Sequence, residues 1–342
     1  MGSFELGSPG PFPLHFLKTL FTSQPKPPTD LDLTGQTWII TGGYTGIGHA
    51  CAETLLKYKL SHLIITARNE SKATEAITRL QSLNPTAKVE AWILEMLSYD
   101  SIQAFIQRCK TLPRIDCVIL NAAVATGQFV LAEQTNHEST FQVNYLSTAL
   151  LTILVLPLLR EKKATGKPPR ITIVSSALAL VTKFAEQNAE QLFPAFDEPR
   201  NWQIPERYNT TKLLLLMFVA KLTGGVNPDE VVINCVEPGL VRNRGLDRNA
   251  PFLLRLAFGV LRALFARSVE AGAWTYIDAA ALQPGTTHGS WILNWAVHPF
   301  PKIMHTAHGK KVAEKLWDET VAELEGAGVR DIISSVAQGS IS

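Results

Sequence analysis

Short runs of apolar residues alternate with amphipathic segments along most of the chain. Each run has about four to eight residues, is rich in Val and Ile, and is bounded by glycine or polar residues, which is typical of a buried strand. The runs are TWIITGG, HLIITAR, KVEAWIL, IDCVILNAA, RITIVSS, VVINCVEPG and GSWILNWAV. Helical segments separate them, including residues 47–59 and a long one that starts near Asn136. This order predicts an α/β fold, with a doubly wound sheet of about seven mostly parallel strands and helices on both faces.

The pattern also suggests how the chain is divided. Residues 1–30 are rich in proline and are expected to form an N-terminal arm. A single domain is expected over residues 31–326, followed by a C-terminal tail over 327–342. Within that domain, 177–207 is a substrate-loop insert and 243–268 a lid region. The sequence has no internal repeat and no low-complexity tract.

The segment TGGYTGIG lies between the first predicted strand and the first predicted helix. Its glycines, Gly42, Gly46 and Gly48, let backbone approach a pyrophosphate, and the helix start supplies N–H donors. Thr45 and Ile47 lie between them and are expected to contact the same ligand. Glycines also serve ordinary turns. Because this cluster opens the first of several βα units, we favour a dinucleotide-binding loop.

The end of the second strand bears on the choice of cofactor. Arg68 stands twenty residues after Gly48, where an NAD-binding fold usually has an acidic side chain for the ribose hydroxyls. A guanidinium pairs with a 2′-phosphate, so NADP(H) is favoured. Two points weigh against this: Arg68 could be a solvated charge, and Thr45 occupies a place where many NADP-dependent proteins have a second basic residue.

The segment YNTTK brings a phenol and an ammonium together. Tyr208 and Lys212 are four residues apart and therefore share one face of a helix. The same spacing fits an ordinary helix start with a lysine at the surface. The five residues alone do not decide between these interpretations.

Composition narrows the range of partners. The net charge of +2 gives no reason to expect nucleic acid as a partner. The four cysteines form no C-x-x-C pair, which favours a reducing, cytoplasmic setting. The N-terminus does not resemble a secretory signal, and the apolar runs are expected to be too short to span a membrane. No metal is expected, because the C-terminal histidines lack ligand spacing; they are His288, His298, His305 and His308.

Five motifs in order, the glycine loop, LNAA, VSS, YNTTK and EPGLV, resemble those of the short-chain dehydrogenase/reductase superfamily. The resemblance runs from about Leu31 to the last helix and implies a Rossmann fold. The segments ARSVEAGAWTYIDAAAL and AHGKKVAEKLWDETVAEL are most similar to the retinol-dehydrogenase-like branch of fungal secondary metabolism.

The resemblance implies four catalytic residues. Tyr208 would be the general acid or base, and Lys212 would hold the nicotinamide ribose and lower the pKa of the phenol. Ser176 would hydrogen-bond the substrate oxygen. Asn144 would bind a water that links Lys212 to solvent. Each residue alone has an ordinary structural explanation, but the four together favour catalysis.

The same resemblance implies further cofactor contacts, although several positions depart from the family pattern. Glu95 replaces an aspartate near the adenine, Ala123, the last residue of LNAA, stands where a glycine is usual, and Asn243 replaces a threonine. The amide of Asn243 still donates and accepts hydrogen bonds. The remaining expected contacts are Met96, Asn121, Ala122, Pro238, Gly239 and Val241.

Two segments are candidates for the substrate side. The insert 177–207 is long for a bare connection and is expected to cover the active site. Its Phe193, Phe196 and Trp202 would either line the site or anchor the insert. Residues 251–268 are amphipathic with a basic stripe, which fits a lid, an interfacial membrane helix, a subunit contact or a core helix.

These observations lead to one main hypothesis. The protein would be an NADP(H)-dependent oxidoreductase that interconverts a carbonyl and an alcohol on a bulky, apolar small molecule, a ketone or aldehyde of secondary metabolism. A non-redox reaction on the same fold, such as a cyclisation or epimerisation, and a cofactor-sensing protein are the alternatives. A cytoplasmic location is expected, and a peripheral contact with the endoplasmic reticulum membrane and a homo-oligomer stay open.

Overall fold

A computed structural model describes residues 1–10, 25–164, 166–242 and 266–338. Asn243, most of the predicted lid 243–268 and most of the amphipathic segment 251–268 lie outside the described residues. The four interpretations of that segment therefore stay predictions.

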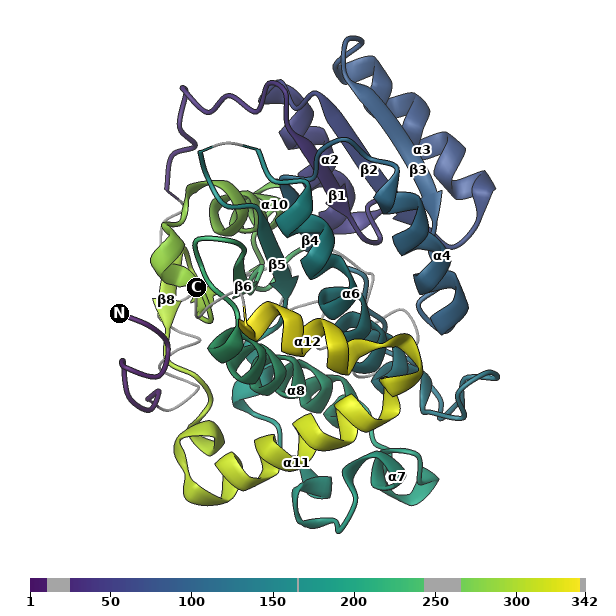
Figure 1. Ribbon diagram of the computed structural model, residues 1–342, viewed down its shortest axis with the longest axis vertical. Coiled ribbons are helices and arrows are strands. Elements are labelled where there is room, and N and C mark those ends of the chain that lie inside the picture. Colours follow the sequence, from purple (N-terminus) through teal and green to yellow (C-terminus); the bar gives the residue numbers. More distant parts are fainter. Residues whose placement is uncertain (11–24, 165, 243–265, 339–342) are drawn as a thin grey trace.

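One sheet organises the described chain, in the strand order β3-β2-β1-β4-β5-β6-β7-β8 (Figure 1). All neighbouring strands pair in parallel except β7 and β8. The predicted doubly wound α/β fold is confirmed. The strands are β1 (Thr37–Ile40), β2 (His62–Ala67), β3 (Lys88–Ile93), β4 (Cys117–Leu120), β5 (Arg170–Val174), β6 (Val232–Val236), β7 (Trp291–Leu293) and β8 (Ala296–His298).

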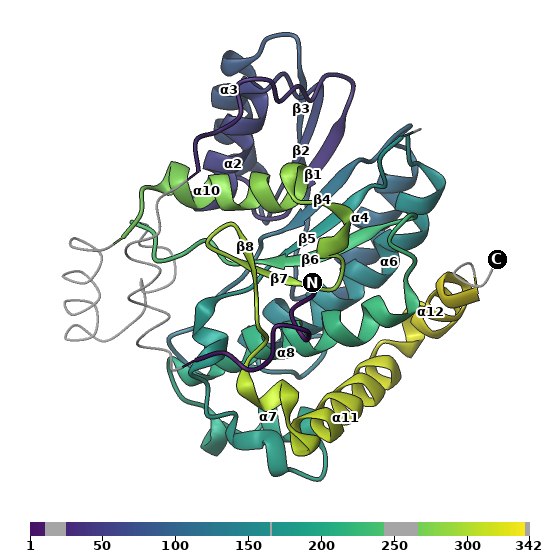
Figure 2. The same cartoon turned by 90° about the vertical axis from the view of Figure 1, so that its left-hand side faces the viewer.

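The helices cover both faces of this sheet (Figure 2). On one face lie α2 (Gly46–Lys57), α3 (Glu70–Leu83) and α10 (Val269–Ile277), while the other face carries α4 (Tyr99–Lys110), α6 (Ser147–Glu161) and α8 (Glu206–Leu222). A short α5 (Ser139–Phe141) and a π-helical turn, η1 (Gln142–Leu146), lead into α6. Outside this layer lie α7 (Leu192–Phe196), α11 (Ala307–Glu323) and α12 (Val329–Gln338).

The strands read as continuous apolar runs because successive residues fill two different cores. Ile39 lies in the core beneath α4, α6 and α8, whereas its neighbour Ile40 lies in the core beneath α2 and α10. Val118 and Ile119 divide between the same two cores. Burial on both faces is what a parallel sheet with crossover helices requires.

The last apolar run, GSWILNWAV, was predicted as one strand and is two. It folds into the hairpin of β7 and β8, whose connecting residues Asn294 and Trp295 have φ angles of +48° and +63°. Two consecutive residues with positive φ make the tight turn that suits a two-residue hairpin. The eighth strand therefore runs antiparallel at the edge of the sheet.

The expectation that no apolar stretch is long enough to span a membrane was wrong. Among the described residues, the helical run Ser139–Glu161 has the length and composition to do so. Nearly all of it is buried inside the protein, between the sheet and its neighbouring helices. The apolar character of this run is thus accounted for by its place in the core.

Both ends of the described chain pack against this body. At the N-terminus, Ser3 is buried and its Oγ accepts a hydrogen bond from the Trp291 N–H at 2.8 Å. Phe4 packs edge-on against Phe300, with ring centroids 4.8 Å apart. At the C-terminus, α12 lies against α6, so that part of the predicted tail belongs to the core cluster.

Candidate active site

In the glycine loop, the chain passes close to itself and to the residues that follow β4. Gly42 and Gly46 have φ angles of +65° and +63°, a region that favours glycine. A Cβ at Gly48 would stand 2.6 Å from Asn121 Nδ2 and 3.0 Å from the Gly42 oxygen. Asn121 in turn donates to the Thr41 oxygen at 2.9 Å, which ties the end of β4 to the loop.

The start of α2 leaves room for an anion. Its N-cap residue, Thr45, makes no side-chain hydrogen bond to the helix, and the first turn carries no acidic residue. The N–H groups of this turn are therefore available to an anionic ligand such as a diphosphate. The donor set and the glycines together suit the pyrophosphate of a dinucleotide.

The residues predicted to contact the adenosine part of the cofactor lie only partly next to the glycine loop. Arg68 is exposed directly after β2, at the same edge of the sheet as the glycine loop. The Glu95 carboxylate accepts a hydrogen bond from the Leu97 N–H at 3.0 Å. The Met96 side chain is buried in the core, so only its backbone faces the edge. Ala122 donates its N–H to Thr41 Oγ1 at 3.0 Å.

The segment after β6 lies beside the start of α10, close to the glycine loop. Gly239 follows Pro238 with a φ of +81°, and Val241 forms a bridge with Arg267. A Cβ at Gly272 would meet side-chain carbons of both Val241 and Ile47, at 2.7 and 3.7 Å. Residues from the glycine loop and from the segment after β6 therefore converge on the start of α10, as their predicted shared role requires.

The four predicted catalytic residues also come together. Ser176, which follows β5, lies beside the Tyr208 hydroxyl and caps the next turn by accepting from the Leu178 N–H at 3.2 Å. Tyr208 and Lys212 lie one turn apart on α8, with the lysine Nζ 5.5 Å from the centre of the phenol ring. The buried Lys212 ammonium donates to the Val174 oxygen at 2.8 Å.

Asn144 lies in the π-helical turn η1, and π-bulges of this kind are frequent at functional sites. Its amide is fully buried and exchanges two hydrogen bonds with the backbone of Val124, both 2.8 Å long. It also donates to Thr211 Oγ1 at 3.1 Å, on the helix of Tyr208. The predicted water between Asn144 and Lys212 stays a prediction.

The electrostatics of Tyr208 differ from the sequence-based expectation. We expected Lys212 to lower the pKa of the phenol. Instead, burial of the hydroxyl and the nearby Glu237 carboxyl raise the pKa of Tyr208, and the neighbouring Ser176 hydroxyl only partly offsets them. Burial also lowers the pKa of Lys212 to about 8. The phenol is therefore protonated at neutral pH, as a proton donor must be, although the raised pKa makes it a weaker acid.

Two residues near this site were missed by the sequence analysis. Glu237, directly after β6, is buried, and the backbone of Gly239 and Ala177 lies beside its carboxyl group. Tyr276, on α10, is buried and donates to Asn121 Oδ1 at 3.1 Å. The acid in EPGLV was a visible signal for Glu237, whereas nothing local distinguishes Tyr276 from the other apolar positions of its helix.

The insert 177–207 is folded and attached to the body of the protein. Phe193 and Phe196 are buried, and their rings pack on Phe141 with centroids 5.1 and 4.6 Å apart. The structure therefore decides that they anchor the insert and do not line the site. Trp202 is only partly buried and stays a candidate for the wall.

The insert is also held from outside by α11. The Glu319 carboxylate accepts hydrogen bonds from the N–H groups of Leu192 and Phe193, both at 2.8 Å. Lys315 donates to the Ala189 oxygen at 2.6 Å.

Over the residues that the structure describes, no group of His, Cys, Asp or Glu side chains is arranged to hold a metal ion.

The parallel α/β sheet, the glycine loop and the Ser176, Tyr208 and Lys212 cluster define a class of nicotinamide-dependent oxidoreductases. Comparison with known proteins gives the same result. A family model described as short chain dehydrogenase matches residues 36–188.

Curated relatives from fungi match nearly the whole chain. The chain is 42% identical to the short chain dehydrogenase/reductase mfmJ of Annulohypoxylon moriforme over 95% of both chains. It is 39% identical to the short chain dehydrogenase virL of Hypocrea virens, over 94% of this chain and 95% of that protein. This protein belongs to the short-chain dehydrogenase/reductase family.

Solved structures share the fold at lower identity. L-sorbose reductase from Gluconobacter frateurii, complexed with NADPH and L-sorbose, is 19% identical with a TM-score of 0.58, covering 77% of this chain and 96% of that one. A 3-oxoacyl (acyl-carrier-protein) reductase from Agrobacterium tumefaciens with NADP bound is 20% identical with a TM-score of 0.57, covering 77% and 94%.

Proposed function

We propose that the protein is an NADPH-dependent reductase, which converts the carbonyl group of a bulky, apolar small molecule into an alcohol. The observation that carries this proposal is that Ser176 lies beside the Tyr208 hydroxyl, with Lys212 one turn further along α8 and its Nζ 5.5 Å from the centre of the phenol ring. A protonated phenol is the form that gives a proton to a carbonyl oxygen.

The residues have separate roles in this reaction. When bound, the nicotinamide supplies the hydride that adds to the carbonyl carbon. Ser176 donates a hydrogen bond to the carbonyl oxygen and stabilises the negative charge that develops there. Tyr208 transfers its proton to the same oxygen, so that the alcohol leaves neutral. The Lys212 ammonium stabilises the phenolate that remains.

The preference for NADPH is supported by Arg68 at the end of β2, because a guanidinium pairs with a 2′-phosphate. Two of the similar solved structures hold NADPH or NADP, and a 3-ketoacyl reductase from Brucella melitensis, 17% identical, holds NADH. The neighbours thus include both cofactors, and the argument for NADPH depends on Arg68.

The apolar character of the substrate is supported by the loops around the site. Val130, Leu131 and Val181 follow β4 and β5 and are exposed, at 48%, 42% and 38%. Val130 also lines a hollow of about 520 Å³, together with Thr126, Gly127 and Gln128. A ketone or aldehyde of fungal secondary metabolism, handled in the cytoplasm, fits these loops and the fungal relatives.

The test begins with the cofactor. Titration of the purified protein with NADPH and NADH should give nicotinamide fluorescence changes, with tighter binding of NADPH. Incubation with aromatic aldehydes, α-diketones and long-chain ketones should then consume NADPH and form the alcohol. Product without net NADPH consumption would indicate a non-redox reaction, and tight binding without turnover of any compound would indicate a cofactor-sensing protein.

A further inference from the structure

The start of α8 lacks the usual means of holding a helix end in place. Tyr208 lies in its first turn, yet the N-cap residue is Pro205, and no side chain caps the helix. The Arg207 N–H is satisfied by the Gln203 oxygen at 2.9 Å, but a turn without a side-chain cap is less fixed than the rest of the helix. The orientation of the Tyr208 side chain must therefore depend on other contacts.

Arg207, the residue before Tyr208, makes such contacts while 4% exposed. Its Nη1 lies 3.1 Å from a Glu186 oxygen, and its Nε lies 3.6 Å from a Glu138 oxygen. Its Nη2 donates to the Phe196 oxygen at 2.9 Å, and the guanidinium lies 4.6 Å from the centre of the Phe196 ring. One buried cation thus contacts two segments of the insert and one of the body.

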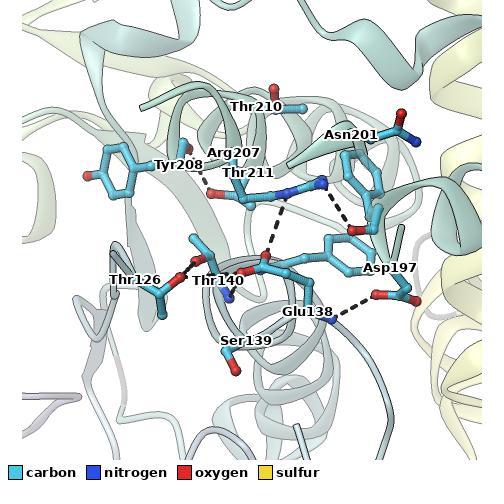
Figure 3. A network of polar contacts seen from close by, with 12 residues as sticks. Thr126, Glu138, Ser139, Thr140, Asp197, Asn201, Arg207, Tyr208, Thr210 and Thr211 are labelled. Carbon is cyan, nitrogen blue, oxygen red and sulfur yellow. Dashed lines mark hydrogen bonds and ion pairs between the residues drawn. The ribbon is translucent and has the colours of Figure 1, made fainter. Parts of the chain in front are cut away.

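Glu138 connects the Arg207 guanidinium to the helical run that carries Asn144 (Figure 3). It is fully buried and caps α5, accepting from the N–H groups of Thr140 and Phe141 at 3.0 and 2.9 Å. Asn144 lies a few residues further along the same helical run. Because Asn144 also bonds Thr211 on α8, two polar contacts join the helix of Asn144 to the helix of Tyr208.

Glu206 secures the opposite side of the same turn. One of its carboxylate oxygens accepts from Thr182 Oγ1 at 2.5 Å, from the Lys183 N–H at 2.6 Å and from the Phe184 N–H at 3.1 Å. The two residues that precede Tyr208 therefore bind the insert with side chains of opposite charge. In Figure 3 the Tyr208 ring points away from Arg207, toward the other side of the helix.

We propose that Arg207 is a positioning residue for Tyr208. Arg207 holds the first turn of α8 in place through its ion pairs with Glu138 and Glu186. The inference rests on the proposed function, since Tyr208 needs a fixed position only if it transfers a proton. Burying a guanidinium with two carboxylates is a poor way to gain stability, because apolar side chains of similar size do as well or better. What the charged junction provides is a defined geometry.

The experiment compares two buried arginines. Arg207→Met removes the junction, and Arg170→Met is the matched control. Arg170 is also buried and donates to the Ala279 and Gln283 oxygens at 2.7 and 2.8 Å, at the amino end of β5 and away from the site. Each variant is assayed for Tm, NADPH dissociation constant, and kcat and KM with phenanthrenequinone as the probe.

We expect both substitutions to lower Tm, but only Arg207→Met to lower kcat, by roughly 100-fold, as for a misplacement of about 1 Å. Its NADPH dissociation constant should change less than about twofold, because the glycine loop is built by other residues. Equal kcat values in the two variants would overturn the proposal.

A third variant separates position from stability. In Arg207→Met combined with Glu138→Gln and Glu186→Gln, no unpaired charge remains buried, so Tm should rise above that of Arg207→Met; it should stay below the wild-type value, because an amide at position 138 offers α5 one cap acceptor in place of two. The kcat should stay low; a kcat restored together with Tm would show that Arg207 has only a structural role. This variant also serves if Arg207→Met alone does not fold.

Failure of the proposed function gives a different result. In that case the wild-type protein binds NADPH but does not consume it with the probe. Hydrogen exchange of peptides that cover residues 206–212 then decides the positioning role. Faster exchange in the triple variant than in Arg170→Met supports it, and equal exchange overturns it.

Discussion

Two helix starts lie at the same edge of the sheet and are built in opposite ways. The start of α2 has glycines and no acidic residue, and no side chain caps it. The start of α8 also lacks a cap, but Glu206 and Arg207 bind it to the insert and to Glu138. The first leaves its donors open for a ligand, and the second uses buried charges to fix its own first turn.

The comparison shows how one sheet edge serves two tasks. A phosphate is bound by backbone groups whose placement depends on local conformation, so a short glycine segment suffices. A catalytic phenol must be held in one orientation relative to groups from other strands, which requires contacts between segments far apart in sequence. The predictions below test this division from the largest expected effect to the smallest.

The largest effect is expected for Tyr208→Phe, which removes the proton donor and leaves the ring in place. The kcat with a reducible ketone should fall by roughly 10²- to 10⁴-fold, the usual contribution of a general acid. The NADPH dissociation constant should stay near the wild-type value. Tyr145→Phe is the control, since it removes another buried hydroxyl, one bonded to Thr320. Unchanged turnover in Tyr208→Phe would remove Tyr208 from the mechanism.

Gly48→Ala tests the other helix start. The added Cβ would lie 2.6 Å from Asn121 Nδ2, so the loop or Asn121 must shift. Overpacking of this kind destabilises a structure by about 1–3 kcal/mol. If this free energy is lost in the NADPH complex, binding of NADPH is weakened by roughly 5- to 150-fold. Fluorescence titration measures it. The control is Gly224→Ala, where a Cβ would meet nothing within 4 Å, and equal affinities in the two variants would contradict the prediction.

Arg68→Ser should change the choice of cofactor with less effect on the protein itself. A hydrogen bond between charged groups contributes about 1.5–3 kcal/mol, so the preference for NADPH over NADH should fall by roughly tenfold or more. The ratio of kcat/KM for the two cofactors measures this change. Lys72→Ser, in the first turns of the following helix, is a nearby basic control. A preserved ratio in Arg68→Ser would show that another residue recognises the 2′-phosphate.

The smallest effect is a pH dependence of stability at the contacts of His137 with the insert and with α11. Burial lowers the pKa of His137, but its contacts with Asp197 and Glu323 outweigh this and raise the pKa from 6.5 to about 9. The stabilisation by the charged imidazole is therefore fully present below pH 6.5 and is lost as the pH rises through about 9. We expect a loss on the order of 1–3 kcal/mol.

Thermal unfolding across this pH range measures the effect. In His137→Gln the decline of Tm toward alkaline pH should be smaller than in the wild-type protein. His62→Gln, which removes a contact with Glu90 near the amino end of β2, is the control. Parallel Tm profiles for wild type and His137→Gln would show that His137 does not contribute the pH-dependent stabilisation.

The sequence predicted those features that depend on neighbours along the chain. The strands followed from apolar runs, because residues such as Ile39 and Ile40 are both buried, although in different cores. The glycine loop and the YNTTK helix face followed from local spacing. The hairpin of β7 and β8 was missed, because its turn is formed by Asn294 and Trp295 and contains no glycine or proline.

The sequence by itself thus determined the doubly wound sheet, the loop at the start of α2 and the order of the catalytic motifs, since each depends on local periodicity or local backbone freedom. Only the tertiary structure decided that burial and Glu237 raise the pKa of Tyr208. It alone also brought Arg207 to Glu138 and Glu186, and placed Phe193 and Phe196 in the core. Those outcomes depend on which distant segments meet and how much water they exclude, and no local pattern encodes either.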